Sequence, residues 1–194
     1  MPHIDPLPRS AAPEFEDVFQ AMEDALGYVP NSFFTMARHP AILRAAGSLM
    51  DAFWYSDTVD EPTRRLVTYA CSHFAGSHYS SAHCACGATE MGLSETKILE
   101  INDFETNPIY SKDERTLLRL CKAAANCPSQ VTPEIIAEVK TRFGAQVTTF
   151  IIGLISCMAF LNRWNEMCGT TLEDIPRTYA EETLKPTGWS LPFS

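Results

Sequence analysis

The sequence has little positive charge and lacks any cluster of basic residues. Its 194 residues carry 15 Lys and Arg against 24 Asp and Glu, a formal net charge of −9. Such a chain repels nucleic-acid backbones and anionic membrane surfaces, so we expect neither as a partner. A hydrophobic content of 45% with 20% charged residues is ordinary for a globular domain and argues against wholesale disorder.

Long apolar segments are also missing. The longest, Phe150 to Leu161, falls short of the ~20 residues that a membrane-spanning helix needs, so we expect it to be a buried core helix. Residues 1–15 contain no apolar signal-peptide core. We therefore expect a soluble, cytoplasmic protein.

The cysteines do not suggest a disulfide framework. Their number is odd, and they are scattered over a chain long enough to form a stable core without disulfide bonds: Cys71, Cys84, Cys86, Cys121, Cys127, Cys157 and Cys168. Without an export signal, we expect reduced thiols, most of them packed as small core residues.

Strand signals are absent, whereas helix signals are frequent. We find no period-2 alternation, hairpin turn or fixed-length repeat. Helix starts are indicated at Asn31 as an N-cap, at Asp60-Glu61-Pro62 and at the capping box Ser111–Glu114. The pattern predicts an all-α bundle of about eight helices over residues 15–169, with an extended arm at 1–14 and a tail at 170–194. Gly144 is expected to end one helix, and a last long one should run from 146 to 167.

One short segment gathers most of the reactive side chains. Residues 73–86 contain His73, His78, His83, Cys84 and Cys86. If a helix starts near His78, then Ser77, Ser80 and Cys84 share a face at its N-terminus, where the helix dipole favours an anion or thiolate. We expect a small polar pocket around residues 65–84, between the apolar helices at 62–74 and 146–167.

At this segment the sequence resembles a known family. Gly76-Ser-His-Tyr-Ser-Ser-Ala-His83 is similar to the signature G-C-x-Y-C-x-x-H of the AhpD-like (carboxymuconolactone decarboxylase) family. Pro30-Asn31, His39-Pro40 and Asn162-Arg-Trp-Asn165 resemble its peroxidase-related branch, so the resemblance covers about residues 28 to 168. It implies a helical oxidoreductase of the alkylhydroperoxidase type, in which a Cys-x-x-Cys pair, a His and an upstream Glu reduce hydroperoxides. It also implies a homo-oligomer, a trimer or hexamer.

The departures from that pattern fall on the reactive positions. Ser77 and Ser80 replace both cysteines, Arg65 stands at the Glu position, and Cys84 stands at the relay His position with His83 beside it. A serine hydroxyl forms neither a disulfide nor a sulfenic acid, so the family's redox cycle cannot run through Ser77 and Ser80. Either the natural protein lost this chemistry or two cysteines were replaced, and the codons at 77 and 80 in the natural gene would decide between the two.

The resemblance and the residues together nominate a site. The predicted catalytic residues are Ser77, Ser80, His83 and Cys84, and the predicted substrate contacts are Arg65, Tyr69 and Trp164. Arg65 would hold a carboxylate, unless Arg64 and Arg65 only form a solvated helix face. Trp164 is otherwise a core aromatic.

Three functions remain open at this point. The first is a small-molecule enzyme of the thiol peroxidase lineage whose redox activity is lost. The second is a cofactor-free acid/base enzyme of the decarboxylase or lyase type, which would use His83, the serine hydroxyls and Arg65. The third is a non-catalytic small-molecule binder or structural oligomer.

We predict no cofactor and no metal site. Zinc held by His83, Cys84 and a third ligand is the alternative. A Cys84–Cys86 disulfide is disfavoured because residues two apart on a helix diverge.

Overall fold

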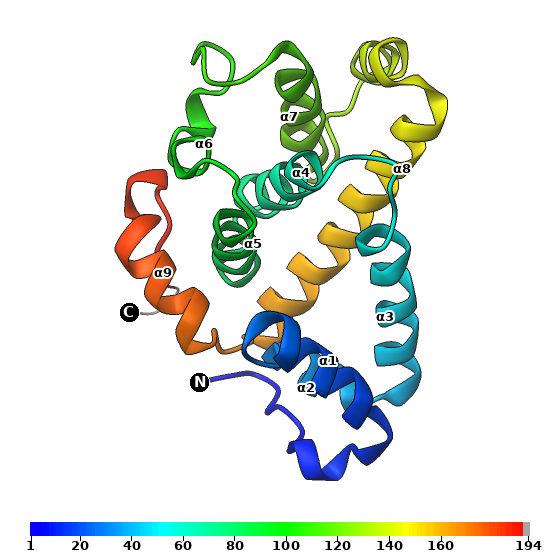
Figure 1. Cartoon of the computed structure of the whole chain (residues 1–194), viewed down its shortest axis with the longest axis vertical. Coiled ribbons are helices and arrows are strands. Elements are labelled where there is room, and N and C mark those ends of the chain that lie inside the picture. Colours follow the sequence, from blue (N-terminus) through cyan, green and yellow to red (C-terminus); the bar gives the residue numbers. More distant parts are fainter. Residues whose placement is uncertain (192–194) are drawn as a thin grey trace.

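The computed structural model describes residues 1–191, which fold entirely into helices and connecting loops, as predicted (Figure 1). The α-helices are α1 (Glu16–Leu26), α2 (Asn31–Ala37), α3 (Pro40–Trp54), α4 (Glu61–Phe74), α5 (His78–Glu90), α6 (Glu95–Leu99), α7 (Lys112–Ala124), α8 (Pro133–Cys168) and α9 (Asp174–Thr183). Short 3₁₀ helices lie at η1 (Arg9–Ala11), η2 (Pro13–Phe15), η3 (Ile101–Asp103) and η4 (Lys185–Thr187).

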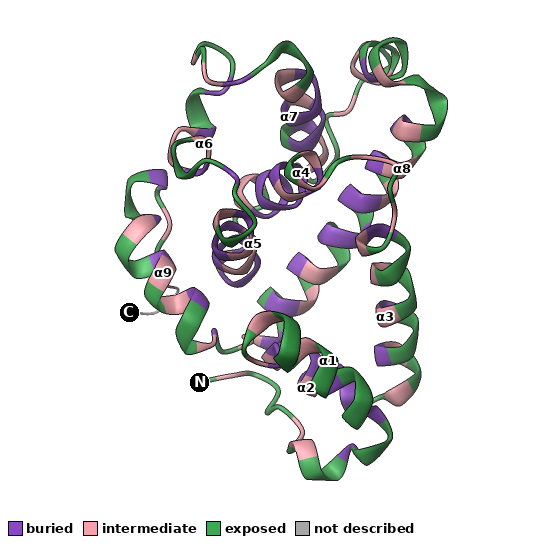
Figure 2. Ribbon diagram, in the orientation of Figure 1, coloured by how far each residue is buried: buried purple, intermediate pink, exposed green. Residues whose placement is uncertain are grey.

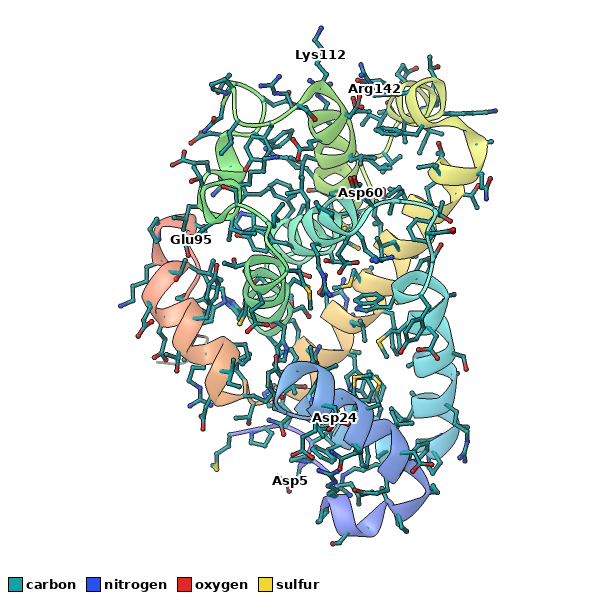
Figure 3. The ribbon with its side chains drawn as sticks, viewed as in Figure 1. Asp5, Asp24, Asp60, Glu95, Lys112 and Arg142 are labelled. Atoms are coloured by element: carbon teal, nitrogen blue, oxygen red, sulfur yellow. The ribbon has the colours of Figure 1, made fainter. Side chains whose placement is uncertain are left out.

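The starts of α4 and α7 follow the local sequence signals. Asp60, labelled in Figure 3 at the start of α4, accepts a hydrogen bond from the backbone N–H of Thr63 at 2.9 Å. Ser111 and Glu114 form the predicted reciprocal capping box at α7. Capping residues satisfy N–H groups that a helix start leaves unpaired, so these positions are readable from sequence.

The long helix α8 confirms one prediction and departs from another. As predicted, one helical segment ends at Gly144, whose φ of 80° and ψ of 168° are not helical, and a second helical segment follows it within α8. Its apolar stretch from Phe150 to Leu161 is not a buried core helix, because Ile152 and Phe160 are exposed. By length and composition alone α8 could cross a membrane, and 33% of its most apolar 18-residue window is buried in this fold. One side of α8 packs on α4 and α7, and the other keeps apolar side chains at the surface.

Two hydrophobic clusters hold the chain together (Figure 2). The larger one lies among α4, α5, α7 and α8, and the smaller one joins α1, α2 and α3 to the N-terminal segment. The segment expected to be an extended arm carries η1 and η2, and Ala12 is buried in the smaller cluster. Its start is also fixed, because the backbone N–H of His3 donates to the carbonyl of Cys168 at 2.8 Å.

The C-terminal segment is a structured part of the fold up to residue 191. We predicted a tail with few apolar anchors, yet it contains α9, which packs along α5. Leu172, Ala180 and Leu184 are buried in the larger cluster. Residues 192–194 of the predicted tail lie outside the described residues. Figure 1 shows the result: α5 lies between α9 on one side and α4 and α8 on the other.

Candidate functional site

The start of α5 is fixed by polar contacts. Ser77 is the N-cap, and its hydroxyl accepts a hydrogen bond from the backbone N–H of Ser80 at 3.4 Å. The carboxylate of Glu166 on α8 accepts from the N–H of His78 at 3.0 Å. Ser77 is 1% exposed and Ser80 is 4% exposed, so the positions that match the family's cysteines are buried.

One face of α5 turns toward α4 and α8. The Ser80 hydroxyl accepts a hydrogen bond from the Asn165 side-chain amide at 3.5 Å, and the Cys84 sulfur lies 3.7 Å from the Ser72 hydroxyl. Burial raises the pKa of the Cys84 thiol, and the Ser72 hydroxyl and the Arg65 charge only partly offset this effect. The helix start therefore does not create the thiolate that the sequence pattern suggested.

A different face of α5 turns toward the C-terminal segment, and His83 lies on it. Its Nδ1 is 3.0 Å from the hydroxyl of Tyr28, in the turn between α1 and α2. Its Nε2 is 2.5 Å from a carboxylate oxygen of Glu173, which immediately precedes α9. The predicted set is thus divided: His83 lies with Tyr28 and Glu173, while Cys84 lies with Ser72, because adjacent helix residues point about 100° apart.

Glu173 binds three partners at once. Besides His83, it accepts a hydrogen bond from the Tyr79 hydroxyl at 2.8 Å and another from the backbone N–H of Asn31. Burial alone would raise the pKa of Glu173, but its bonds to His83 and Asn31 outweigh burial and lower it. Glu173 is therefore a charged carboxylate held inside the protein. Asn31 was predicted to cap α2, but Pro30 is the N-cap and the Asn31 side chain donates to the Thr171 carbonyl at 2.9 Å.

Two tyrosine rings enclose the imidazole of His83. Tyr79 stacks on it with ring centroids 4.4 Å apart, and Tyr28 meets it edge-on at 5.4 Å. Burial raises the pKa of Tyr28 far above its usual range, and the negative charges of Glu173 and Glu90 add to this effect. The Tyr28 phenol thus stays protonated at neutral pH. With a neutral imidazole, the phenol donates to Nδ1 and Nε2 carries the proton that faces Glu173.

Neither arginine of α4 forms a solvated face. Arg64 is buried and donates to the carbonyls of Phe53 at 2.9 Å and Ser56 at 2.8 Å. Arg65 is partly buried and donates to Glu61 at 2.6 Å, and its guanidinium also faces Gly87 of α5. The positive charge predicted to hold a substrate carboxylate is therefore already paired with Glu61.

The two remaining predicted contacts lie away from His83. Tyr69 is fully buried, and its hydroxyl donates to the carbonyl of Ile98 at 3.1 Å. Trp164 packs in the smaller cluster and donates from Nε1 to the Thr35 hydroxyl at 2.9 Å. Both residues act as packing residues in this arrangement.

Residues 1–191 contain no group of three His, Cys, Asp or Glu side chains placed to hold a metal ion. His83 and Cys84, the suggested zinc ligands, turn toward different neighbours. All seven cysteines are free thiols.

A groove lies on the His83 side of α5. It has a volume of about 560 Å³ and is lined by residues of α5 and α9: Cys86, Thr89, Glu90, Asp174, Ile175, Thr178, Tyr179 and Glu182. His83 is three residues before Cys86, on the same face of α5. The turn at Gly27 and Tyr28 lies beside it, because a Cβ at Gly27 would be 3.5 Å from the Ile175 side chain.

Sequence reasoning missed Tyr28 and Glu173. Tyr28 belongs to no motif, so nothing local marked it. Glu173 had a signal that we did not use: Glu173-Asp174-Ile-Pro176 is a typical acidic, proline-containing helix start. Its partner His83 is 90 residues away in sequence.

The raised pKa of Cys84 gives a first prediction. At pH 7.5, iodoacetamide should modify Cys84 far more slowly than the exposed Cys127, because the thiolate is the reactive form. His83→Ala should leave the Cys84 rate unchanged. Peptide mapping by mass spectrometry measures both rates, and a fast Cys84 that slows in the His83 variant would show that the two side chains do act together.

The whole chain resembles several solved helical proteins that share one fold. No protein-family model matches the sequence, and no curated protein matches it. Among solved structures, the apo debrominase Bmp8 is 29% identical with a TM-score of 0.83, covering 95% of this chain and 97% of that one. A cysteine-to-alanine variant of Bmp8 in complex with 2,3,4-tribromopyrrole is 28% identical with a TM-score of 0.85, and the match covers 93% of this chain and 96% of that one. An AhpD-core, peroxidase-related protein from Ralstonia eutropha is 17% identical with a TM-score of 0.78, covering 90% and 94%, a likeness of fold alone.

Proposed function

Because the chain belongs to the AhpD-like fold family but carries Ser77 and Ser80 at the expected redox positions, we propose that it is a proton-transfer enzyme acting on a small ring molecule, and not a working thiol peroxidase. One observation carries the proposal: both nitrogens of His83 are engaged, one by a phenol and the other by a buried carboxylate.

The proton path follows from the hydrogen bonds. A substrate proton passes to the Tyr28 oxygen while the Tyr28 proton passes to Nδ1 of His83. The imidazolium formed in this way is stabilised by Glu173, whose own bonds to Tyr79 and Asn31 keep it ionised. The reverse sequence returns a proton to the substrate. Tyr28 is the catalytic residue because it can touch substrate, and His83 and Glu173 act through it.

The substrate class is suggested by the neighbouring structures. Bmp8 is a debrominase whose cysteine-to-alanine variant binds a brominated pyrrole, a small ring of high apolar content. Removing a bromine by thiol chemistry needs a sulfur nucleophile, and buried serine hydroxyls do not supply one. Proton exchange at a ring carbon needs only an acid and a base, both of which the Tyr28–His83–Glu173 set provides.

The test uses 2,3,4-tribromopyrrole as the probe. In deuterated buffer, the protein should accelerate exchange of the single ring-carbon hydrogen, followed by NMR. Tyr28→Phe and His83→Gln should each slow this exchange about 10²–10⁴-fold. Ser77→Ala, on the other face of α5, is the matched control and should retain exchange.

Two results would overturn the proposal. One is exchange no faster than in buffer alone or unchanged in the Tyr28 variant. The other is dithiol-dependent release of bromide by the unmodified chain, which would mean that thiol chemistry operates without Ser77 and Ser80.

We also propose a cytoplasmic homo-oligomer. The seven free thiols suit a reducing compartment. An apolar groove of about 320 Å³ lies between α3 and α8, and beside it Leu49 is 44% exposed and Phe160 is 38% exposed. A second copy covering this surface would remove it from water. Light scattering should give a mass above the 21.6 kDa of one chain, with Leu49→Glu lowering it, and a 21.6 kDa species at micromolar concentration would contradict this.

A further inference from the structure

The groove between α5 and α9 has the size and position of a substrate-binding site. Its volume of about 560 Å³ falls within the range of small-molecule sites. The two helices contribute successive turns that face each other, and the groove is bridged where the hydroxyls of Thr89 and Tyr179 meet at 2.8 Å. A small ring with one substituent fits this volume.

The groove lies beside the segments that carry the proton-transfer residues, because the Ile175 side chain that lines it is 3.5 Å from where a Cβ at Gly27 would lie. Glu90 lines it and lies close enough to Tyr28 for its negative charge to raise the pKa of the phenol. Glu173 immediately precedes Asp174, the first lining residue of α9. A ligand in the groove therefore lies next to the turn that carries Tyr28 and to the residue that follows Glu173.

The lining selects the charge of that ligand. It contains three carboxylates, Glu90, Asp174 and Glu182, and no Lys, Arg or His. Ile175 and the ring of Tyr179 supply apolar area between them. Burial raises the pKa of Cys86 to about 11, so its thiol adds no charge at neutral pH. An anion would be repelled along the whole groove, whereas an ammonium group would be attracted.

We propose that this groove binds a small aromatic or heteroaromatic amine in its cationic form, with the ring against Ile175 and Tyr179 and the ammonium toward the carboxylates. As the substrate site, this assignment rests on the proposed proton-transfer function. It also replaces Arg65 as the determinant of substrate charge, because Arg65 is paired with Glu61 on α4. The expected substrate is thus a cation, whereas the sequence suggested a carboxylate.

The experiment compares three probes of equal size: benzylamine, benzyl alcohol and benzoate. Calorimetric titration at low salt should show that benzylammonium binds more tightly than benzyl alcohol, and benzoate more weakly than either. The difference should shrink in 0.5 M salt, since exposed charges are screened. Glu90→Gln with Glu182→Gln should weaken benzylammonium about three- to tenfold, while Glu181→Gln, on α9 but outside the lining, should not.

A labelling measurement fixes the place of binding. In a Cys127→Ser background, the thiol introduced by Thr178→Cys lies in the groove, and benzylammonium should slow its alkylation. Equal binding of benzoate and benzylammonium, or alkylation unaffected by saturating benzylammonium, would overturn the assignment.

His83→Gln should still bind benzylammonium. If binding holds but wild-type ring exchange is absent, the proposed function fails and the groove stands; if exchange holds but binding shows no preference for the cation, only the groove assignment fails.

Discussion

Replacing both Ser77 and Ser80 by cysteine is expected to create a reducible disulfide and measurable turnover of an organic hydroperoxide with a dithiol. The two positions are three residues apart at the start of α5, so their side chains lie on neighbouring turns. The Ser77 side chain already reaches the backbone of residue 80. The unmodified chain should show no such turnover, so the change is from nothing to a measurable rate.

The disulfide is measured by intact mass and peptide mapping after mild oxidation, since seven native thiols are also present. Ser77→Cys alone is the matched control, because one new thiol has no partner at position 80. A folded double variant that forms no bond between 77 and 80 would show that these positions do not correspond to the family's cysteine pair.

Glu173→Ala is expected to be the most destabilising single change near the site. It removes the acceptor from His83, Tyr79 and the backbone N–H of Asn31 together. Leaving buried partners of a charged group unsatisfied costs about 3–5 kcal/mol, a large share of a domain's ~5–15 kcal/mol of stability. Denaturant melts measure the loss.

Two comparisons sharpen that result. Glu173→Gln keeps an acceptor for these donors and should cost less than alanine. Glu181→Ala, at an exposed position of α9, should change stability by under about 0.5 kcal/mol. A Glu173→Ala protein as stable as the Glu181 variant would mean that the C-terminal segment is not tied to α5 through this carboxylate.

The lowered pKa of Glu173 adds a pH signature. In the unfolded chain a Glu titrates near its ordinary value of about 4.3, so as the pH falls the unfolded state takes up the proton first. The stability that Glu173 contributes is complete above that value and is lost as the pH falls through its lower folded pKa. The wild type should therefore lose more stability than Glu173→Gln between neutral pH and the acid range below about 4.3, as followed by melts across that range.

The elements and residues that the sequence predicted are those set by local chemistry. The starts of α4 and α7 depend on side chains within four residues of one another, at Asp60 and Ser111. The placement of His83 depends on Tyr28, 55 residues earlier, and on Glu173, 90 residues later. The hydrophobic periodicity of a sequence does not reveal contacts between residues so far apart along the chain. The outward face of α8 was missed for a related reason: apolar side chains predict burial, but they do not say whether the covering surface belongs to the same chain.

The two faces of α5 have a consequence for how such a protein changes over generations. The Ser77–Ser80 side and the His83 side share one backbone but have separate partners, Asn165 on one and Glu173 on the other. A codon change that removes the sulfur chemistry of the first side leaves the contacts of the second side in place. One activity can therefore be lost during evolution while the other is retained. The two faces of this thirteen-residue helix can thus accumulate substitutions separately.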